Sequence, residues 1–441
     1  MTNNSKICRE LYEISLSMSP VNFNSTPDDS SYEFDRMELN IFKERYPDIN
    51  IKVDGNFAIF NYGITSDFSN PIIQEARGII INLVTLEVVC WPFRKFGKYD
   101  EYYADTIDWK SAVVQEKIDG SIIKLWFDKD NLQWKWSTNS MINAADAICN
   151  KESGETFMDA IRKTKEYETM IDLVDGFAYK SIYDEAKIKI IHTNYDSDIN
   201  TKLGHLTYIF ELTTPDNRVV INHKYYEMTL IGARNNITGD EYDLLIDCID
   251  RPRKYDLHHL DDCIEWCKIM NNDEYNMIGN VYHEGFVVVD KNFNRVKIKT
   301  PEYMLFHGLI SGDKVSVKNL VELIYYNRLD ITSICRNFPE LAHIILFYSY
   351  QVEEMLYEAH AIIDIARKLN KILSGNRKEI AMRIKDMRLS MLGFKALDNP
   401  ELSENDIIEG FYESGIMTKC LPRYSGENFS NCFRDLPENE C

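Results

Sequence analysis

The sequence predicts an α+β protein in which antiparallel sheets with flanking helices are followed by an all-helical C-terminal domain. From about Ile51 to Pro301, short runs rich in β-branched and aromatic residues alternate with turns, which is typical of strands. After Pro301 these runs stop, and long patterns with helical spacing take their place. The chain has 441 residues, 44% of them hydrophobic, which is enough for a large core and two or three domains.

The order of the elements follows from the same patterns. Residues 6–47 are expected to form a helical arm in two pieces with a polar break at 22–31, and residues 155–174 one amphipathic helix. Strands are expected at 57–60, 78–81, 87–91, 111–114, 122–127, 206–210, 219–221, 229–231, 285–289 and 295–299. The C-terminal helices are expected at 317–326, 339–373 and 377–392.

We place a domain boundary near residues 301–315, where the strand pattern ends. The N-terminal domain then covers residues 1–305, with its helical arm at 1–50, and the helical domain covers 306–441. The last twenty residues have no period and are expected to be a loosely held tail. No role can be assigned to the segment 141–205.

Composition limits where the protein acts. No stretch of 18 uncharged apolar residues exists, and the first residues lack the pattern of a signal peptide, so we expect a soluble cytoplasmic protein with no membrane partner. The ten cysteines have no disulfide-like rhythm and are expected to be reduced thiols. Cys263 and Cys267, just after His258 and His259, leave a structural zinc as an alternative, although their spacing fits a helix face better.

The charge of the chain is strongly negative but uneven. A net charge of −20 argues against non-specific binding of nucleic acid by the whole surface. The stretch 367–388 nevertheless holds eight Lys or Arg residues against only Glu379 and Asp386. The candidates for contact with a nucleic acid in this stretch are Arg377, Lys378, Arg383 and Lys385. The alternative is a solvated helix face.

The segment Glu116–Ser121, with the sequence Glu-Lys-Ile-Asp-Gly-Ser, lies between two predicted strands. A lysine at such a junction, followed by Asp-Gly, suits a covalent nucleotidyl-lysine site. Its amine is fixed at a pocket edge, a carboxylate lies near it, and the glycine lets a phosphate approach the backbone. Alone, the pattern is equally typical of a surface hairpin turn. Other motifs of the chain are needed to distinguish a nucleotidyl-lysine site from a hairpin turn.

Nucleotidyl transfer needs cations placed in advance, because attack of a lysine amine on the α-phosphate of ATP develops negative charge. Lys297 and Lys299 alternate with apolar residues, so both lie on one face of a predicted strand, which could also be its solvent face. The candidate cations are Arg77, Lys95, Lys297 and Lys299. We expect this cluster also to lower the pKa of Lys117, so that its amine is free near neutral pH.

Two carboxylates on predicted strands complete the set. Glu211 ends one apolar strand, and Glu284 opens another. A divalent metal and a nucleotide ribose both require oxygen ligands, and these two side chains are the candidates. The alternatives are an edge-strand carboxylate for Glu211 and a residue that merely precedes a strand for Glu284.

Taken in order, these motifs resemble those of the covalent nucleotidyltransferases, the superfamily of DNA ligases, RNA ligases and mRNA capping enzymes. The shared motifs are Lys117-Ile118-Asp119-Gly120, Phe210-Glu211, Glu284-Gly285-Phe286-Val287 and Lys297-Ile298-Lys299. Further motifs resemble the RNA ligase 1 family of T-even phages in particular. They are Ile59-Phe60-Asn61-Tyr62, Arg77-Gly78-Ile79, Pro92-Phe93-Arg94-Lys95-Phe96, Pro215-Asp216-Asn217-Arg218-Val219-Val220 and Lys297-Ile298-Lys299-Thr300. The resemblance covers roughly residues 55–305, and it identifies the N-terminal domain as a nucleotidyltransferase domain.

The resemblance implies an ATP-dependent RNA ligase that works in three steps. Lys117 would take AMP from ATP, the AMP would pass to an RNA 5′-phosphate, and an RNA 3′-hydroxyl would displace it. The implied substrates are single-stranded RNA or broken tRNA ends in a host cell, with a polynucleotide kinase/phosphatase as a functional partner. A DNA ligase or capping enzyme is the alternative, but those enzymes carry an OB-fold where this chain reads as helical. A catalytically inactive nucleotide- or RNA-binding relative is the other alternative.

The same resemblance assigns roles to individual residues. The implied ATP contacts, besides Lys117, are Tyr62, Arg77, Lys95, Glu211, Lys297 and Lys299. Glu284 would hold or organise Mg²⁺ or Mn²⁺, and Asp330 is the nearest match for a metal-contacting aspartate of the helical domain.

Two positions depart from the family pattern. The family has a lysine one short strand after the nucleophile, where this chain has Thr138, and Lys135 is the nearest replacement. An aromatic residue expected after Phe96 is Gly97. Both departures concern the range of substrates and the later steps, and leave adenylylation of Lys117 possible in principle.

Overall fold

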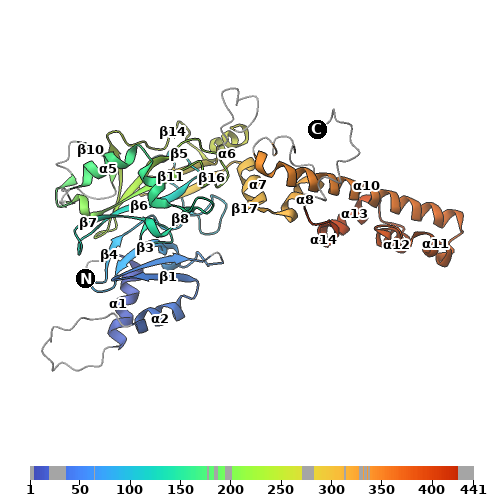
Figure 1. Ribbon diagram of the computed structural model, residues 1–441, viewed down its shortest axis with the longest axis horizontal. Helices are drawn as coiled ribbons and strands as arrows, with labels where there is room; N and C mark the ends of the chain where they lie inside the picture. Colours follow the sequence, from blue (N-terminus) through green and yellow to red (C-terminus); the bar gives the residue numbers. More distant parts are fainter. Residues whose placement is uncertain are drawn as a thin grey trace. The chain divides into compact units, whose positions relative to one another are not determined.

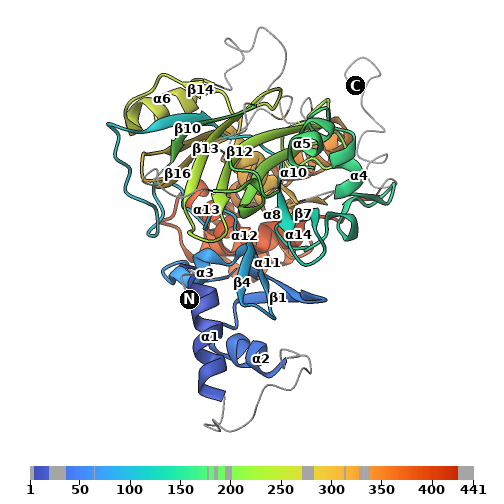
Figure 2. The same cartoon turned by 90° about the vertical axis from the view of Figure 1, so that its left-hand side faces the viewer.

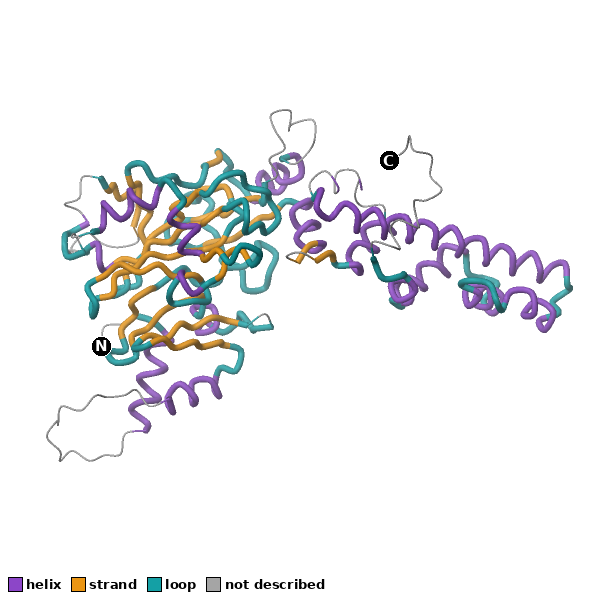
Figure 3. The backbone as a smooth tube through the Cα atoms, viewed as in Figure 1, coloured by secondary structure: helices purple, strands orange, loops and turns teal. Residues whose placement is uncertain are grey.

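A computed structural model of the chain describes residues 4–18, 36–63, 65–175, 178–182, 187–193, 201–270, 283–311, 314–326, 331, 335 and 338–425. The chain divides into two compact units, Met1–Met304 and Leu305–Cys441. The first unit contains three antiparallel sheets with flanking helices, and the second is mostly helical (Figures 1 and 3). Within the ranges given, no helix has the length and apolar character that crossing a bilayer requires.

The first sheet packs against the N-terminal helices. Its strands pair in the order β1-β2-β3-β4, at Ile49–Asp54, Phe57–Tyr62, Arg77–Asn82 and Glu87–Cys90. Helices α1 (Lys6–Met18), α2 (Arg36–Arg45) and α3 (Pro71–Glu75) share a buried core with this sheet, and Figure 2 shows α1 and α2 together on one side of it. The two helical pieces expected in the arm are confirmed. The polar break expected between them lies outside the described residues.

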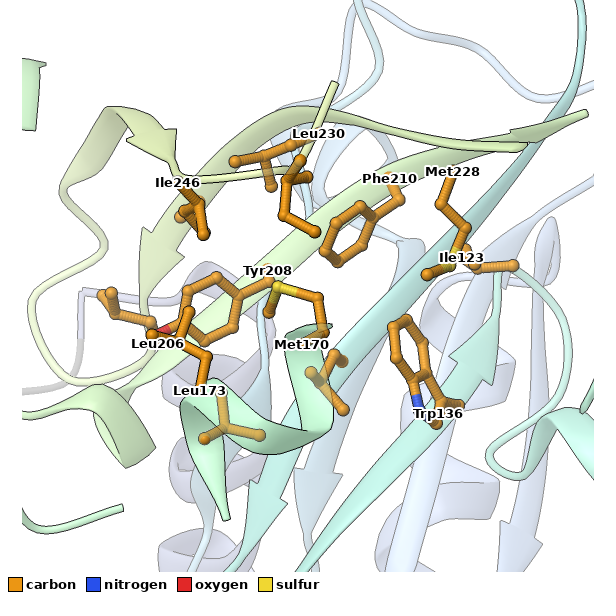
Figure 4. Packing of buried hydrophobic residues seen from close by; sticks show 14 of the residues in the cluster. Ile123, Trp136, Met170, Leu173, Leu206, Tyr208, Phe210, Met228, Leu230 and Ile246 are labelled. Carbon is orange, nitrogen blue, oxygen red and sulfur yellow. The ribbon is translucent and has the colours of Figure 1, made fainter. Parts of the chain in front are cut away.

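The second sheet is the largest and carries the Phe210-Glu211 motif. Its order is β10-β13-β12-β11-β6-β7, at Ile188–Thr193, Glu241–Ile246, Glu227–Asn235, Leu206–Thr213, Ser121–Asp128 and Gln133–Thr138. Helices α4 (Phe157–Arg162) and α5 (Glu166–Val174) belong to the core on one face, where Met170 and Leu173 approach Tyr208 (Figure 4). Each fully buried apolar side chain of this kind stabilises the fold by on the order of 1.5–3 kcal/mol.

The third sheet carries the motifs of Glu284–Val287 and Lys297–Lys299. Its order is β14-β5-β15-β16, at Lys254–Tyr255, Val113–Glu116, Gly285–Val289 and Arg295–Lys299. Helix α6 (Leu260–Ile269) packs on it through Cys263 and Cys267, which are both buried in the apolar core. The zinc alternative for these cysteines is therefore wrong, because their side chains face hydrophobic neighbours, and within the described ranges no three His, Cys, Asp or Glu side chains gather to hold a metal ion.

The segment 141–205, which had no expected role, contributes both to the core and to a cavity wall. It contains a short pair of strands, β8 (Ile148–Asn150) and β9 (Glu155–Thr156), besides α4, α5 and β10. The single helix expected over 155–174 is wrong, because the chain breaks after α4. There the Thr164 hydroxyl donates to the carbonyl of Ile161 (2.7 Å), an alternative to continued helix.

The strand expected at 219–221 is also wrong. These residues form an irregular loop between β11 and β12. The backbone N–H groups of Val220 and Ile221 donate to the carboxylate of Asp119 at 2.9 and 2.7 Å, so they are satisfied without a neighbouring strand.

The second unit is built around one long helix. Its main helices are α8 (Val317–Tyr325), α10 (Ala342–Ile372), α11 (Arg377–Ile384), α12 (Ser390–Asp398), α13 (Glu404–Glu413) and α14 (Ile416–Cys420), and α7 (Pro301–Leu309) spans the division between the units. Helix α10 runs through the apolar core that α8 and α11–α14 complete. The single helix expected over 377–392 is wrong, because Leu389 has a left-handed backbone (φ 58°) between α11 and α12. Asp330 and residues 426–441 lie outside the described residues.

Candidate active site

Lys117 lies in the link between the second and third sheets. It directly follows β5, which pairs with β14 and β15, and its backbone N–H donates to the carbonyl of Gly285 (2.8 Å). Four residues later the chain enters β6, which pairs with β11. The Lys117 side chain is therefore held where the two sheets come together, as the strand–turn–strand pattern predicted.

The Asp-Gly pair of the motif fixes this turn. Asp119 is 4% exposed, and its carboxylate accepts the two N–H groups of the 219–221 loop on Oδ2 and the Tyr303 hydroxyl on Oδ1 (2.6 Å). A Cβ on Gly120 would lie 2.4 Å from the carbonyl oxygen of Leu212, so no larger residue fits there without a shift. The sequence argument expected a phosphate to approach the backbone at Gly120. In this structure it is strand β11 that approaches the backbone there.

Glu284 joins two lysines of the predicted set. Its carboxylate accepts from Lys117 Nζ at 2.8 Å on Oε2 and pairs with Lys299 Nζ at 2.9 Å on Oε1. The side chain of Glu284 is 3% exposed, so this ion triad is largely withdrawn from water. Breaking a buried pair of this kind leaves an uncompensated charge, which makes each member costly to remove.

The acids around Lys117 outweigh the cations in their effect on its pKa. Burial lowers the pKa of Lys117, but the charges of Glu284, Glu211 and Asp119 together raise it above the ordinary lysine value. The expectation of a lowered pKa for this nucleophile is therefore wrong for the ligand-free protein. In this state the side chain is an ammonium held by Glu284.

Lys297 has the lowered pKa that was expected of Lys117. Burial, together with repulsion from Lys95, Arg77 and Lys117, lowers the pKa of Lys297 to about 7. Lys299, two residues along the same strand face, is instead paired with Glu284. The expected lysine pair thus lies on one face of β16, but its two members differ in electrostatic environment.

Glu211 is the second carboxylate near Lys117. It lies on β11 opposite Ile122 of β6. Burial raises the pKa of Glu211 to about 7; Glu284 adds to the rise, and Lys117 opposes it. A carboxyl group that titrates near neutral pH can hold or release a proton during a reaction in this site.

The other predicted cations, Arg77 and Lys95, lie against aromatic rings. The Arg77 guanidinium is 5.1 Å from the ring centre of Phe96, and Lys297 Nζ is 5.8 Å from the same ring. Lys95 Nζ lies 5.0 Å from the ring centre of Tyr62. These contacts, with the mutual charge effects above, place the predicted ATP-contacting residues in one neighbourhood.

Two cavities meet at Lys117, Arg77, Ile122 and Glu211. The smaller, about 70 Å³, is lined largely by apolar and aromatic side chains, including Phe93, Phe96, Ile231 and Val287. The larger, about 620 Å³, is lined mainly by polar groups and by part of the 141–205 segment, including Ser121, Thr138, Asn139, Ser140, Asp146 and Phe157. A further cavity of about 180 Å³ adjoins the smaller one through Gln115, Ile231, Val289 and Arg295.

The structure also explains the position where the family has another lysine. Thr138 is buried, and its hydroxyl accepts the N–H groups of Ser140 and Met141, which closes a tight turn. Lys135 does not replace the missing cation, because its ammonium pairs with Asp128 at 2.8 Å. That expectation was wrong because Lys135 lies on the face of β7 that packs near Phe57.

Lys124 is a buried cation that the sequence argument missed. Its Nζ donates to the carbonyl of Gly78 (2.6 Å), beside Arg77, and its side chain is fully buried. Burial lowers the pKa of Lys124 to about 8. The signal in the sequence was a single charge inside the apolar run 122–127, at a position that strand periodicity places toward a core.

The basic stretch of the second unit is partly neutralised. Arg377 pairs with Asp398, and Arg383 pairs with Glu379 at 2.9 Å. No ion pair within the described part of the chain involves Lys378 or Lys385. Of the four predicted contacts, these two lysines keep the most available charge.

Metal ligands are sparse near Lys117. Among the described residues, no group of three or more His, Cys, Asp or Glu side chains is arranged to hold a metal ion. Three carboxylates, Glu284, Glu211 and Asp119, act on the charge of Lys117, and Asp119 is engaged by the Val220, Ile221 and Tyr303 donors, which leaves Glu284 and Glu211 as the candidates. They provide oxygen donors of the kind that Mg²⁺ and Mn²⁺ prefer, in a number that leaves room for phosphate and water ligands.

Comparison with known proteins adds a family to this geometry. The sequence model of a family described as RNA ligase matches residues 75–303. A protein of Autographa californica nuclear polyhedrosis virus, assigned as a bifunctional polynucleotide kinase/RNA ligase, is 28% identical over 264 residues, 56% of this chain and 33% of that protein. The chain thus spans about a third of the length of this relative. An RNA ligase of Rhodothermus phage RM378 is 21% identical over 449 residues, 87% of this chain and 95% of the phage protein.

Solved structures give more distant similarities. Form 1 of an archaeal ATP-dependent RNA ligase matches with a TM-score of 0.36 and 10% identity, over 90% of this chain and 93% of that one. Form 2 matches with a TM-score of 0.38 and 11% identity, over 76% and 83%.

Proposed function

The chain belongs to the RNA ligase family, whose sequence model matches residues 75–303, and we propose that it joins an RNA 5′-phosphate to an RNA 3′-hydroxyl with ATP as co-substrate. The observation that carries the mechanism is the position of Lys117. Its amine lies at the meeting point of two cavities, beside Glu284 at 2.8 Å and near the cations Lys297 and Arg77.

In the proposed first step, the Lys117 amine attacks the α-phosphorus of ATP, a P–N bond forms, and pyrophosphate leaves. The ammonium must first lose a proton. Glu284 accepts the hydrogen bond from that ammonium, and Glu211, with its pKa raised to about 7, provides a second proton acceptor nearby. The attraction of Glu284 keeps Lys117 protonated, so this step requires the Glu284 oxygens to be engaged elsewhere.

A divalent ion would offset phosphate charge in this site, and Glu284 with Glu211 would hold it. Asp330 remains a prediction from the sequence for the same purpose. The chain's own cations would then stabilise the charge that develops on the α-phosphate, chiefly Lys297, with Lys95 and Arg77 beside it. Lys299 would keep Glu284 in place when Lys117 leaves it.

The two cavities suit different parts of the substrates. The smaller one, with Phe93, Phe96 and Ile231, offers the apolar and aromatic walls that a nucleobase prefers, so we place the adenine of ATP there. Tyr62, beside Lys95, would contact the phosphates. The larger cavity, with its hydroxyl and amide groups, would accept the polar backbone of an RNA end.

The RNA partners are proposed from the family and from charge. Single-stranded RNA or broken tRNA ends would be the substrates, and Lys378 and Lys385, with Arg377 and Arg383, would contact the RNA backbone. The viral relative assigned as both kinase and ligase supports a polynucleotide kinase/phosphatase as the partner that prepares RNA ends. The reaction would take place in the cytoplasm of the host cell if a phage encodes the protein.

Labelling with ATP tests the proposal. With α-labelled ATP and Mg²⁺, the wild type should acquire a covalent label that is stable to alkali and released by acid, as a P–N bond requires; Lys117→Ala and Lys117→Arg should both lack it, while the matched variant Lys110→Ala keeps it. Lys117→Arg retains a cation for Glu284, so loss of label there points to the nucleophile and not to the ion pair. A wild type without label would indicate an inactive relative.

The choice of nucleotide and nucleic acid distinguishes the remaining alternatives. Labelling by GTP in place of ATP would indicate a capping enzyme. Joining of 5′-phosphorylated single-stranded RNA, but not of a nicked DNA duplex, is the result expected of an RNA ligase. The opposite result would indicate a DNA ligase.

A further inference from the structure

A strip of four aromatic side chains continues from Lys95. The aromatic strip consists of Tyr62, Phe68, Tyr103 and Tyr102, in which neighbouring ring centres are 5.0, 5.1 and 5.1 Å apart. Lys95 Nζ lies between the first two rings, 5.0 Å from Tyr62 and 4.9 Å from Phe68. At the other end of the strip, Tyr102 is 73% exposed. The aromatic strip thus leads from the Lys95 cation to the exposed ring of Tyr102.

The strip is attached to the strand that carries Lys297. The Tyr99 N–H donates to the Lys297 carbonyl (3.2 Å), and the Lys297 N–H donates to the Gly97 carbonyl (3.1 Å). The segment that carries Tyr102 and Tyr103 is therefore tied to β16 by backbone hydrogen bonds. A Cβ on Gly97 would lie 3.2 Å from the Tyr103 ring, so a larger residue at position 97 would crowd this ring.

The acidic side chains in this region hold the rings in place. The Tyr102 hydroxyl donates to Asp67 Oδ1 (2.9 Å), and Asp67 also accepts from Ser69. Glu101 accepts the backbone N–H of Lys98 (2.7 Å) and a hydrogen bond from Tyr103. These carboxylates are engaged in fixing the loop, and the exposed ring of Tyr102 remains for a ligand.

Exposed aromatic rings next to lysines are the usual platform for single-stranded nucleic acid, because bases stack on the rings while the cations meet the phosphates. We propose that the aromatic strip binds the terminal base of the 5′-phosphorylated RNA strand during the second step of ligation. This inference rests on the proposed function.

The stereochemistry of the second step points to this end of the RNA. Displacement at phosphorus is in line, so pyrophosphate leaves on the side opposite Lys117 in the first step. In the second step an oxygen of the RNA 5′-phosphate attacks the same phosphorus from that vacated side. A P–O bond forms, the P–N bond to Lys117 breaks, and the lysine leaves as an amine that takes up a proton.

The incoming 5′-phosphate therefore needs the cations that served the pyrophosphate. Lys95 lies close enough to Lys297 to help lower its pKa by repulsion, and Lys95 also touches the aromatic strip. A 5′-phosphate held by these lysines would bring its own base next to Phe68, Tyr103 and Tyr102. The adenine of AMP does not compete, because its proposed cavity is lined by Phe93, Phe96 and Ile231 and by no member of the strip.

The test separates the two half-reactions. In Tyr102→Ala, lysyl-AMP should form at the wild-type rate, while transfer of AMP to a 5′-phosphorylated single-stranded RNA should slow about tenfold, as expected for loss of one stacked base. Tyr102→Phe should restore the transfer rate, because the ring and not the hydroxyl does the stacking. Tyr179→Ala is the matched control: Tyr179 is 60% exposed and packs edge-on against one aromatic ring, Phe127, outside the strip.

A modified RNA makes the test specific for the base. An RNA with an abasic 5′-terminal nucleotide should react about tenfold more slowly with the wild type and show no further loss with Tyr102→Ala. Equal transfer by the wild type and Tyr102→Ala, or an abasic penalty of the same size in both, would overturn the inference. These results require normal lysyl-AMP formation, so they differ from failure of the proposed function, in which the wild type forms no lysyl-AMP.

Discussion

The hydrogen bond from Tyr303 to Asp119 allows the role of the motif turn to be measured. The Tyr303 hydroxyl donates to Oδ1 at 2.6 Å, and the two residues are only 3% and 4% exposed. A hydrogen bond to a charged group contributes about 1.5–3 kcal/mol, so Tyr303→Phe should lower the free energy of unfolding by about 2 kcal/mol.

Asp119→Asn should cost more than Tyr303→Phe. The amide oxygen keeps the bonds from Val220 and Ile221, but all three hydrogen bonds lose the carboxylate charge. If each of the three hydrogen bonds becomes weaker by about 1 kcal/mol, Asp119→Asn should lower the free energy of unfolding by about 3 kcal/mol. In the Asp119→Asn background the bond from Tyr303 to position 119 is neutral, so the double variant should show a coupling energy of about 1 kcal/mol.

Urea unfolding followed by tryptophan fluorescence suits this measurement. All six tryptophans lie in the sequence before residue 305, so the signal reports the unit that holds the turn. The rate of lysyl-AMP formation should fall together with stability, since the same turn carries Lys117. A Tyr303→Phe variant within 0.5 kcal/mol of the wild type would refute the reasoning, as would an Asp119→Asn variant that is the milder of the two.

Three further predictions concern charge. Because the pKa of Lys117 in the ligand-free protein lies above its ordinary value, the rate of lysyl-AMP formation at ATP concentrations well below saturation should rise about tenfold per pH unit from pH 6 upward; a flat profile would contradict a limiting deprotonation. The pKa of Lys124 is lowered to about 8 in the folded protein. Below pH 8, where Lys124 is protonated in both the folded and the unfolded protein, burying its charge costs about 3 kcal/mol of folding free energy. This cost disappears as the pH rises from 8 to about 10.5, the ordinary lysine pKa. The gain in unfolding free energy of Lys124→Met over the wild type should therefore shrink by about 3 kcal/mol from pH 7 to 10.5, whereas a constant difference would mean that Lys124 titrates normally. Neutralising Lys378 and Lys385 together should reduce the slope of log affinity for single-stranded RNA against log salt by about 1.4, and neutralising the ion-paired Arg377 and Arg383 should reduce it less; an unchanged slope in both variants would exclude this surface.

The sequence predicted those features that depend on local periodicity. Alternation in residues 295–299 placed Lys297 and Lys299 on one strand face, and the pairing of Gly285 with Lys299 brings Glu284 next to that face. The α+β class, the helical second unit and the strand–turn–strand setting of Lys117 follow from patterns of the same kind.

Features that depend on distant contacts were not predictable. The Asp119–Tyr303 bond joins residues 184 positions apart, and neither residue type in its local context signals the other. The sign of the Lys117 pKa shift depends on a few ångströms between Lys117 and Glu284, which no pattern contains. The sequence argument named Lys135 as the nearest replacement for the missing cation and missed Lys124, because only the packing shows which lysine of the two neighbouring strands is buried beside Arg77.

The contrast between the two lysines has a consequence for chemical inhibitors. At neutral pH, Lys117 in the ligand-free protein is an ammonium paired with Glu284. A sizeable fraction of Lys297, in contrast, is a free amine, because its pKa is about 7. An aldehyde or an activated ester that enters the ligand-free site therefore encounters Lys297 as the more reactive amine. A covalent ligand designed against the resting protein is best aimed at Lys297, and its attachment there would remove a cation of the proposed phosphate site without modifying Lys117, the proposed nucleophile.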